Sequence, residues 1–530
     1  MTEHGVAGSE SPPGPEAPAV GDQRGAVSGS VPSASVSQLR WLEIAVAAIA
    51  IAAGLLALAG PLATLAAALA AGAIFAIFWR ADVATIVFAF AFYANVLVVA
   101  ARFHGVPTPL ASMVVLLLLL PMFRSIVIHR NPVVVTSTLG YMFLFLCSMM
   151  VSTAVSPSPG ISLPLIGSFF LEGIVLYFLV SNVANDVRRV QNIILVLVIA
   201  GVFMAALSVF QELTRSYDNN FFGFAQVSEG GFDVGEGDDA VLRQRLAGPI
   251  GEQNRYAQVL LMVVPLAYFA GRVAKQRFQR VLWYLAAALI AAGVFLTFSR
   301  GAAVAAFAVL FLMVLHRVIS IGRLVVIVLV AGLLMAAVAP DYVLRIASLG
   351  TVTEATDSEA DVDGAIRGRT TEALAAINVF VDHPVVGVGP NRFFREFSQI
   401  EANKLGLKRL DTNRRSHNLY LELAADQGLL GLGAFGLIMG ATVTQLASAR
   451  KRWLVRDPER AALASGLMFA LYSYLITAFF LQLSYQRYLW AMVALANGVI
   501  WCLRDAERVS PMFRYRGAEH HTRSAVHAEQ

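Results

Sequence analysis

The chain has 530 residues, of which 57% are hydrophobic and 14% charged, and its formal net charge is +5. Soluble domains average about 25% charged residues, so this composition excludes an ordinary soluble protein and predicts a polytopic membrane protein. Most of the positive charge lies in short loops between apolar runs. It therefore reflects membrane topology, and we expect no nucleic-acid binding.

The N-terminal stretch, residues 1–39, is rich in Gly, Pro, Ser and Ala and contains no apolar core. A segment of this kind cannot bury enough apolar surface to fold, and it lacks the apolar stretch of a signal peptide. We expect a disordered cytosolic tail at 1–39.

Residues 40–504 form the predicted membrane domain. Apolar runs of about 17–25 residues can cross a bilayer as helices, because a helix satisfies its backbone hydrogen bonds internally. The predicted fold class is all-α, a polytopic transmembrane helical bundle of about 12–14 spans. The runs are 42–59, 62–79, 83–101, 110–123, 132–155, 162–183, 190–210, 256–271, 281–298, 302–316, 324–340, 417–446, 461–482 and 488–503.

Most Lys and Arg residues of the short loops fall on one side of these spans, as Arg80 and Arg450 do, whereas the other side has only Arg102, Arg300 and Arg487 outside two long loops. The positive-inside rule assigns the side rich in Lys and Arg to the cytoplasm. Both termini are then cytoplasmic, including a short tail at 505–530. Two long outward-facing loops remain, at 211–255 and 341–416.

The second outer loop ends in Arg414-Arg415-Ser416-His417-Asn418 and leads directly into the apolar run 417–446. An imidazole thus lies at the rim of the membrane, with Ser416 as the expected N-cap. Histidine has the side-chain pKa nearest neutrality, so His417 is a candidate base for a reaction at this face. A histidine that only packs at a helix start fits the same pattern.

Outward-facing arginines point to a phosphate ligand. Outside the cell there is no ATP, so a reaction there must use an energy-rich substrate carried in the membrane, commonly a diphosphate. Guanidinium groups bind phosphate oxygens in bidentate fashion. Arg300 lies at the outer end of a span, within Thr297-Phe298-Ser299-Arg300-Gly301. Snorkelling of its side chain to the interface is the alternative.

Two further arginine sets lie in the outer loops. Arg367 and Arg369 open a segment whose apolar positions predict a short amphipathic helix on the membrane surface, namely Leu374, Ile377 and Val381. The first loop contains Arg243, Arg245 and Arg255 around a Gly-Pro turn that ends at Asn254. Each of these arginines also fits a solvated loop charge.

The sequence predicts neither a metal site nor a cofactor. Cys147 and Cys502 both fall inside predicted spans, and no outward group of His, Asp and Glu has metal-ligand spacing. Glu422 and Asp426 follow His417 by five and nine residues, off its helical face, so we expect no local His–carboxylate pair. Glu172 is the acid deepest in a span and is expected to pair or to line a cavity.

Several motifs follow one another between residues 245 and 440. They are Arg245-Leu246-Ala247-Gly248-Pro249 with Asn254, Ser299-Arg300-Gly301, Arg369 leading to His383-Pro384 and Gly387-Val388-Gly389, and His417-Asn418-Leu419-Tyr420-Leu421 with Asp426-Gln427-Gly428-Leu429-Leu430-Gly431. In this order they resemble the O-antigen ligase and polymerase superfamily of bacterial polysaccharide assembly. Asp426 is a departure, because the family usually has Glu there.

The resemblance implies a GT-C-like membrane enzyme of the bacterial cytoplasmic (inner) membrane. Such an enzyme would transfer a glycan from undecaprenyl diphosphate to an acceptor glycan or glycolipid, with inversion and without a metal. His417 would then be the base, and Arg300 and Arg369 would stabilise the leaving diphosphate. Substrate binding would fall to Arg245, Asn254, Arg367, Arg415 and Asn418. Membrane lipids and other polysaccharide-export proteins are the expected partners.

Two alternatives remain open. A transporter or lipid-linked oligosaccharide flippase is the rival class, but such proteins keep polar groups near the middle of the bilayer, whereas this chain concentrates them in two outer loops. Within the family, the shared motifs do not separate a ligase from a repeat-unit polymerase.

Overall fold

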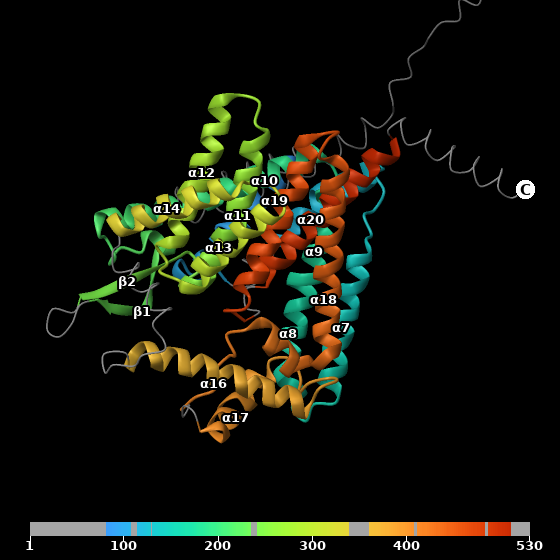
Figure 1. The fold of residues 1–530 in the computed structure, drawn as a ribbon. Helices are drawn as coiled ribbons and strands as arrows, with labels where there is room; N and C mark the ends of the chain where they lie inside the picture. The colour runs from blue at the N-terminus through green and yellow to red at the C-terminus, as the bar shows by residue number, and fades with distance from the viewer. Residues whose placement is uncertain are drawn as a thin grey trace, which may run out of the picture. The chain divides into compact units, whose positions relative to one another are not determined.

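The computed structural model describes residues 81–107, 114–128, 130–234, 241–338, 360–406, 411–482 and 486–509. All of them belong to one compact unit, Ala76–Gln530. Helices dominate this unit, which confirms the all-α class (Figure 1). The expected tail 1–39 and the predicted spans 42–59 and 62–79 lie outside the described residues, as does almost all of the tail 505–530.

The helices begin and end close to the predicted spans. In chain order they are α3 (Ala81–Tyr93), α4 (Val96–Phe103), α6 (Leu119–Phe123), α7 (Ser137–Ala154), α8 (Pro159–Ser168), α9 (Leu176–Val183), α10 (Val187–Thr214), α11 (Gln253–Val273), α12 (Arg277–Phe295), α13 (Arg300–Leu315), α14 (Ile321–Val338), α16 (Ala360–Asp382), α17 (Ser398–Leu405), α18 (Leu419–Trp453), α19 (Pro458–Thr477) and α20 (Arg487–Val509).

In the described part, eight helices are long and apolar enough to cross a membrane, and nine if the bent pair α3–α4 is one span. Every predicted span in this part coincides with a helix or a run of helices. The run 162–183 becomes α8 and α9 joined by a π-helical turn, Phe169–Val175. The run 110–123 gives only a short apolar helix, and so do 302–316 and 324–340. The total of about 12–14 spans therefore stays a prediction.

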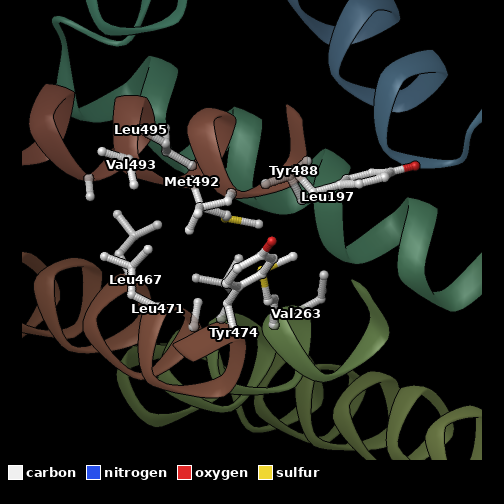
Figure 2. Close-up of a cluster of buried hydrophobic side chains, with 14 of the residues drawn as sticks. Leu197, Val263, Leu467, Leu471, Tyr474, Tyr488, Met492, Val493 and Leu495 are labelled. Carbon is white, nitrogen blue, oxygen red and sulfur yellow. The ribbon is translucent and has the colours of Figure 1, made fainter. Parts of the chain in front are cut away.

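The core of the unit lies where α10, α11, α19 and α20 meet. Figure 2 shows its side chains, among them Leu197 of α10, Val263 of α11, Leu471 of α19 and Met492 of α20. Tyr474 and Tyr488 belong to the same cluster and are 1% exposed. Rings and branched side chains from four helices interdigitate here, which makes the bundle a rigid support for the loops at its ends.

A β-hairpin occupies part of the first predicted outer loop, where the sequence indicated no strands. β1 (Gln226–Val234) pairs antiparallel with β2 (Val241–Gly248), with Ser228 opposite Arg245. Short strands in a polar loop show only weak alternation, so pairing across the hairpin rather than local pattern forms them. The hairpin fixes the backbone that carries Arg245.

The second predicted outer loop contains two helices, α16 and α17. In Figure 1, α16 lies across one end of α18 instead of running along it. It begins at Ala360, so the expectation that Arg369 opens this helix is wrong. Its buried side includes Ala375, Ala376 and Val379, whereas Ile377 and Val381 are exposed. Ile377 and Val381 give α16 an exposed apolar face, as expected of an amphipathic helix whose apolar face is covered by another apolar surface.

A break in α18 joins this layer to the bundle. Gly428 leaves the helical conformation (φ 62°, ψ −159°), and Gly387 in the loop after α16 has φ 66°. A Cβ on either glycine would overlap backbone atoms of the other segment. The backbone bonds between them are Val388 N to Ala425 O (3.0 Å), Gly389 N to Asp426 O (2.8 Å) and Leu429 N to Pro384 O (2.8 Å). The two glycine-containing motifs therefore form one interlocked joint.

Candidate active site

A pocket on the described surface brings together four of the predicted residues. It is partly open to solvent, and its lining includes Arg245, Asn254, Arg300 and Arg369. These residues come from β2, α11, α13 and α16. Residues that are far apart in the sequence thus converge on one polar cavity, which we call the arginine pocket.

Arg245 is held on one wall of the arginine pocket by two acceptors. Its Nε donates to the carbonyl of Thr297 (3.2 Å), and an Nη donates to Oδ1 of Asn254 (3.3 Å). Asn254 in turn donates its amide to Glu252 (2.9 Å), the N-cap residue of α11. This network orients the guanidinium, so less side-chain freedom is lost when an anion binds.

Arg300 is the first residue of α13, directly behind the N-cap Ser299, whose hydroxyl accepts from Ala302 N. Residues 298–302 all line the arginine pocket. The first backbone N–H groups of a helix have no partners within the helix and carry a partial positive charge. Arg300 and the start of α13 together therefore form a suitable site for a phosphate group.

Arg369 approaches the same pocket from α16, where its side chain is exposed. Arg367 lies on α16 two residues earlier, and its side chain is outside the described part. Arg255, by contrast, is buried in α11, where it donates to Gln258 (3.0 Å) and to the carbonyl of Gln482. It joins α11 to the segment after α19 and does not line the arginine pocket.

His417 lies directly before α18 in the left-handed backbone conformation, with φ 52°. A residue with a side chain rarely adopts this conformation, and it is found at functional sites more often than elsewhere. Its ring is 38% exposed, and its Nδ1 lies 2.8 Å from Oε2 of Glu372 on α16. A paired Nδ1 leaves Nε2 as the atom available to a ligand.

One expectation about the surroundings of His417 needs correction. The N-cap of α18 is Asn418, not Ser416, because its Oδ1 accepts from Tyr420 N (3.0 Å) and Leu421 N (3.1 Å). The carboxylate that pairs with His417 belongs to Glu372 of α16. That carboxylate is 45 residues away in the sequence, and no local pattern could have revealed it.

His417 and the arginine pocket share two supports. On α16, Arg369 lines the pocket and Glu372 holds the imidazole. At the end of α19, Thr477, Phe480 and Leu481 line the pocket, while the carbonyl of Ala478 accepts from Leu419 N (2.9 Å) at the start of α18. His417 itself does not line the arginine pocket, but residues 417–419 and the pocket both contact α16 and the segment at the end of α19.

Residues 285–436 match the family model described as O-antigen ligase. This segment is similar to the O-antigen ligase family, and we call it the O-antigen ligase domain. A search of curated proteins found no match to the chain. The matched range contains Arg300, Arg369, Glu372 and His417, and the structure adds Arg245 and Asn254 from outside it. The match to this family and the long apolar helices together indicate a multi-pass membrane protein related to O-antigen ligases.

Other polar residues of the O-antigen ligase domain are bound within the protein. Arg415 pairs with Glu422 (2.6 Å), donates to Asn391 (3.1 Å) and stacks on Phe394 (4.5 Å to the ring centre). The Asn418 amide oxygen caps α18. Both residues flank His417, so they help to hold the backbone that carries the imidazole.

Asp426 is buried and supports the joint between α18 and the loop that follows α16. Its two carboxylate oxygens accept from Asn391 N (2.7 Å) and Phe393 N (2.8 Å). These two hydrogen bonds tie the segment 391–393 to α18.

In the described part of the O-antigen ligase domain and its surroundings, no three His, Cys, Asp or Glu residues lie close enough together to hold a metal ion. Glu172 is half-buried in the π-helical turn between α8 and α9 and does not line the arginine pocket. Guanidinium groups line the arginine pocket, and the imidazole of His417 pairs with the buried carboxylate of Glu372.

Proposed function

We propose that the protein transfers a glycan from undecaprenyl diphosphate to an acceptor hydroxyl on the outer face of the cytoplasmic membrane. The observation that carries this proposal is the arginine pocket, in which Arg245, Arg300 and Arg369 meet at the start of α13. The helix that carries Arg369 also carries Glu372, the partner of His417. A diphosphate is the ligand that matches this concentration of positive charge. The match of residues 285–436 to the O-antigen ligase family supports the same reaction type.

The arginines would act on the leaving group. As the bond between the sugar C1 and the diphosphate oxygen breaks, negative charge develops on that oxygen. Guanidinium groups and helix N–H groups that already point at it stabilise this charge without reorganisation. Arg300 and Arg369 would contact the diphosphate, and Arg245, oriented by Asn254, would complete the cradle. Arg367, on the same helix as Arg369, is the candidate for further contact with the carrier.

His417 would act on the acceptor. Its Nε2 would take the proton from the acceptor hydroxyl while the acceptor oxygen forms a bond to C1 on the side opposite the diphosphate. This single displacement inverts the configuration at C1, and its products are the lengthened glycan, undecaprenyl diphosphate and a protonated imidazole. The reaction uses no metal. Arg415 and Asn418 would serve the substrate by keeping His417 in place.

The test is to size the glycan on undecaprenyl diphosphate in a deletion strain. Single repeat units would identify a polymerase, and long chains left on the carrier would identify a ligase. The lipid-linked sugar is then labelled with a membrane-impermeant oxidant in intact cells. Labelled material supports transfer at the outer face. Material that stays unlabelled supports a flippase, and no accumulation at all contradicts the proposal.

A further inference from the structure

The buried carboxylate of Glu372 has a partner at each oxygen. Oε2 lies 2.8 Å from His417 Nδ1, and Oε1 lies 3.9 Å from Nη1 of Arg414, while the Glu372 side chain is only 3% exposed. A buried carboxylate is unfavourable unless it is paired. The buried residues of α16 next to Glu372 are mainly alanine and valine. Packing alone therefore does not explain a carboxylate at this position.

We infer that Glu372 is a positioning residue that holds His417 in the tautomer needed to accept a proton. This inference rests on the proposed function. A carboxylate can only accept from a ring N–H, so Nδ1 must carry the proton and Nε2 keeps its lone pair for the acceptor hydroxyl. When Nε2 takes the proton, the nearby carboxylate also stabilises the imidazolium that forms.

The placement of Glu372 on α16 links the two halves of the reaction. Residues three apart on a helix are neighbours on its surface, so Arg369 and Glu372 move together. Arg369 lines the pocket for the diphosphate, and Glu372 orients the base. Any shift of α16 relative to α18 would therefore disturb both leaving-group stabilisation and proton acceptance.

Because Arg414 lies on the Oε1 side of Glu372, the substitution Glu372→Gln has a predictable effect on the tautomer of His417. In Glu372→Gln the amide oxygen is drawn to Arg414, the cation on the Oε1 side, which leaves the amide NH2 group facing His417 Nδ1. An NH2 group donates to Nδ1, so the imidazole would then carry its proton on Nε2 and could not act as a base. The substitution keeps the size of the side chain while reversing the tautomer.

The experiment uses the full chain in proteoliposomes, with lipid-linked glycan extracted from a deletion strain as donor. Glu372→Gln and Glu372→Ala are compared with Glu401→Gln, which alters another poorly exposed, paired carboxylate that contacts Lys404 (2.6 Å) and not His417. We expect the Glu372 variants to lose between about tenfold and about 10⁴-fold in kcat with little change in KM. Glu401→Gln should stay within about twofold of wild type, because Glu401 neither contacts His417 nor lines the arginine pocket.

Two further readouts separate positioning from folding. Thermal unfolding shows which variants are folded, and ¹⁵N NMR of labelled histidine, assigned with His417→Gln, reports which ring nitrogen carries the proton. We expect that proton to move from Nδ1 to Nε2 in Glu372→Gln. Wild-type turnover in either folded Glu372 variant, with His417→Ala inactive, overturns the inference alone. An active His417→Ala instead overturns the assignment of His417 as base in the proposed function.

Discussion

At the scale of single residues, the site contains groups whose orientation is fixed by hydrogen bonds to other parts of the protein. Arg245 is held by a carbonyl and an amide, and His417 by a buried carboxylate. Exposed arginines such as Arg395 lie nearby without lining the pocket. Fixed groups stabilise a transition state more than mobile ones, because no reorganisation is needed during the reaction.

Removal of either half of the site should stop polymer assembly. His417→Ala removes the base, which is typically worth about 10²–10⁴-fold in rate. Arg369→Ala removes one cation from the leaving group, which is worth about 10²–10³-fold. Polymer is measured on gels of whole-cell glycan, and immunoblots of membranes confirm insertion. Near-normal assembly in both variants would refute the site.

Arg300→Lys tests whether geometry matters in addition to charge. Lysine keeps the positive charge but offers no planar fork for bidentate phosphate binding, so we expect a loss of about tenfold or more in donor turnover. The control is Arg395→Lys, which changes an exposed arginine that stacks on Phe394 (5.1 Å) and lies outside the pocket. Equal activity of the two variants would argue against direct phosphate contact by Arg300.

At the scale of elements, the joint between α18 and the loop after α16 explains why two separate glycine motifs occur in the chain. Gly387 and Gly428 let the two backbones approach until they exchange hydrogen bonds. Asp426 then supports the turn that carries Asn391, which contacts Arg415 beside His417. The joint thereby fixes α16, and with it Arg369 and Glu372, relative to the bundle.

Gly428→Ala should destabilise the protein by at least about 1–3 kcal/mol, because alanine strains this backbone conformation and its Cβ overlaps the Val385 carbonyl. Gly433→Ala, in the same helix with open space at its Cβ position, is the control and should be neutral or slightly stabilising. Thermal unfolding in detergent measures both. Equal melting temperatures would show that the joint contributes little to stability.

At the scale of the whole molecule, the orientation in the membrane is still a prediction from loop charge. Lys404, on α17 in the second outer loop, and Lys275, between α11 and α12, have exposed side chains on opposite predicted faces. In a variant without Cys147 and Cys502, Lys404→Cys should react with an impermeant maleimide in intact cells. Lys275→Cys should react only after permeabilisation, and the reverse pattern would invert the topology.

The sequence by itself determined the membrane class and the places of the apolar helices in the described part. It also named the arginines that meet in the pocket, whereas the roles of these arginines and of His417 stay predictions. These signals are local, because apolar length and residue type can be read from neighbouring positions. Local patterns predicted neither the earlier start of α16 nor the β-hairpin, because contacts with other segments form them.

Only the tertiary structure decided that Arg245, Arg300 and Arg369 share one pocket and that His417 has Glu372 as its partner. Arg255 shows the same limit. Like Arg245, it lies in the first predicted outer loop, but its side chain is buried in the bundle. The physical reason is that packing of helices far apart in the chain sets which side chains meet, and no local pattern records that packing.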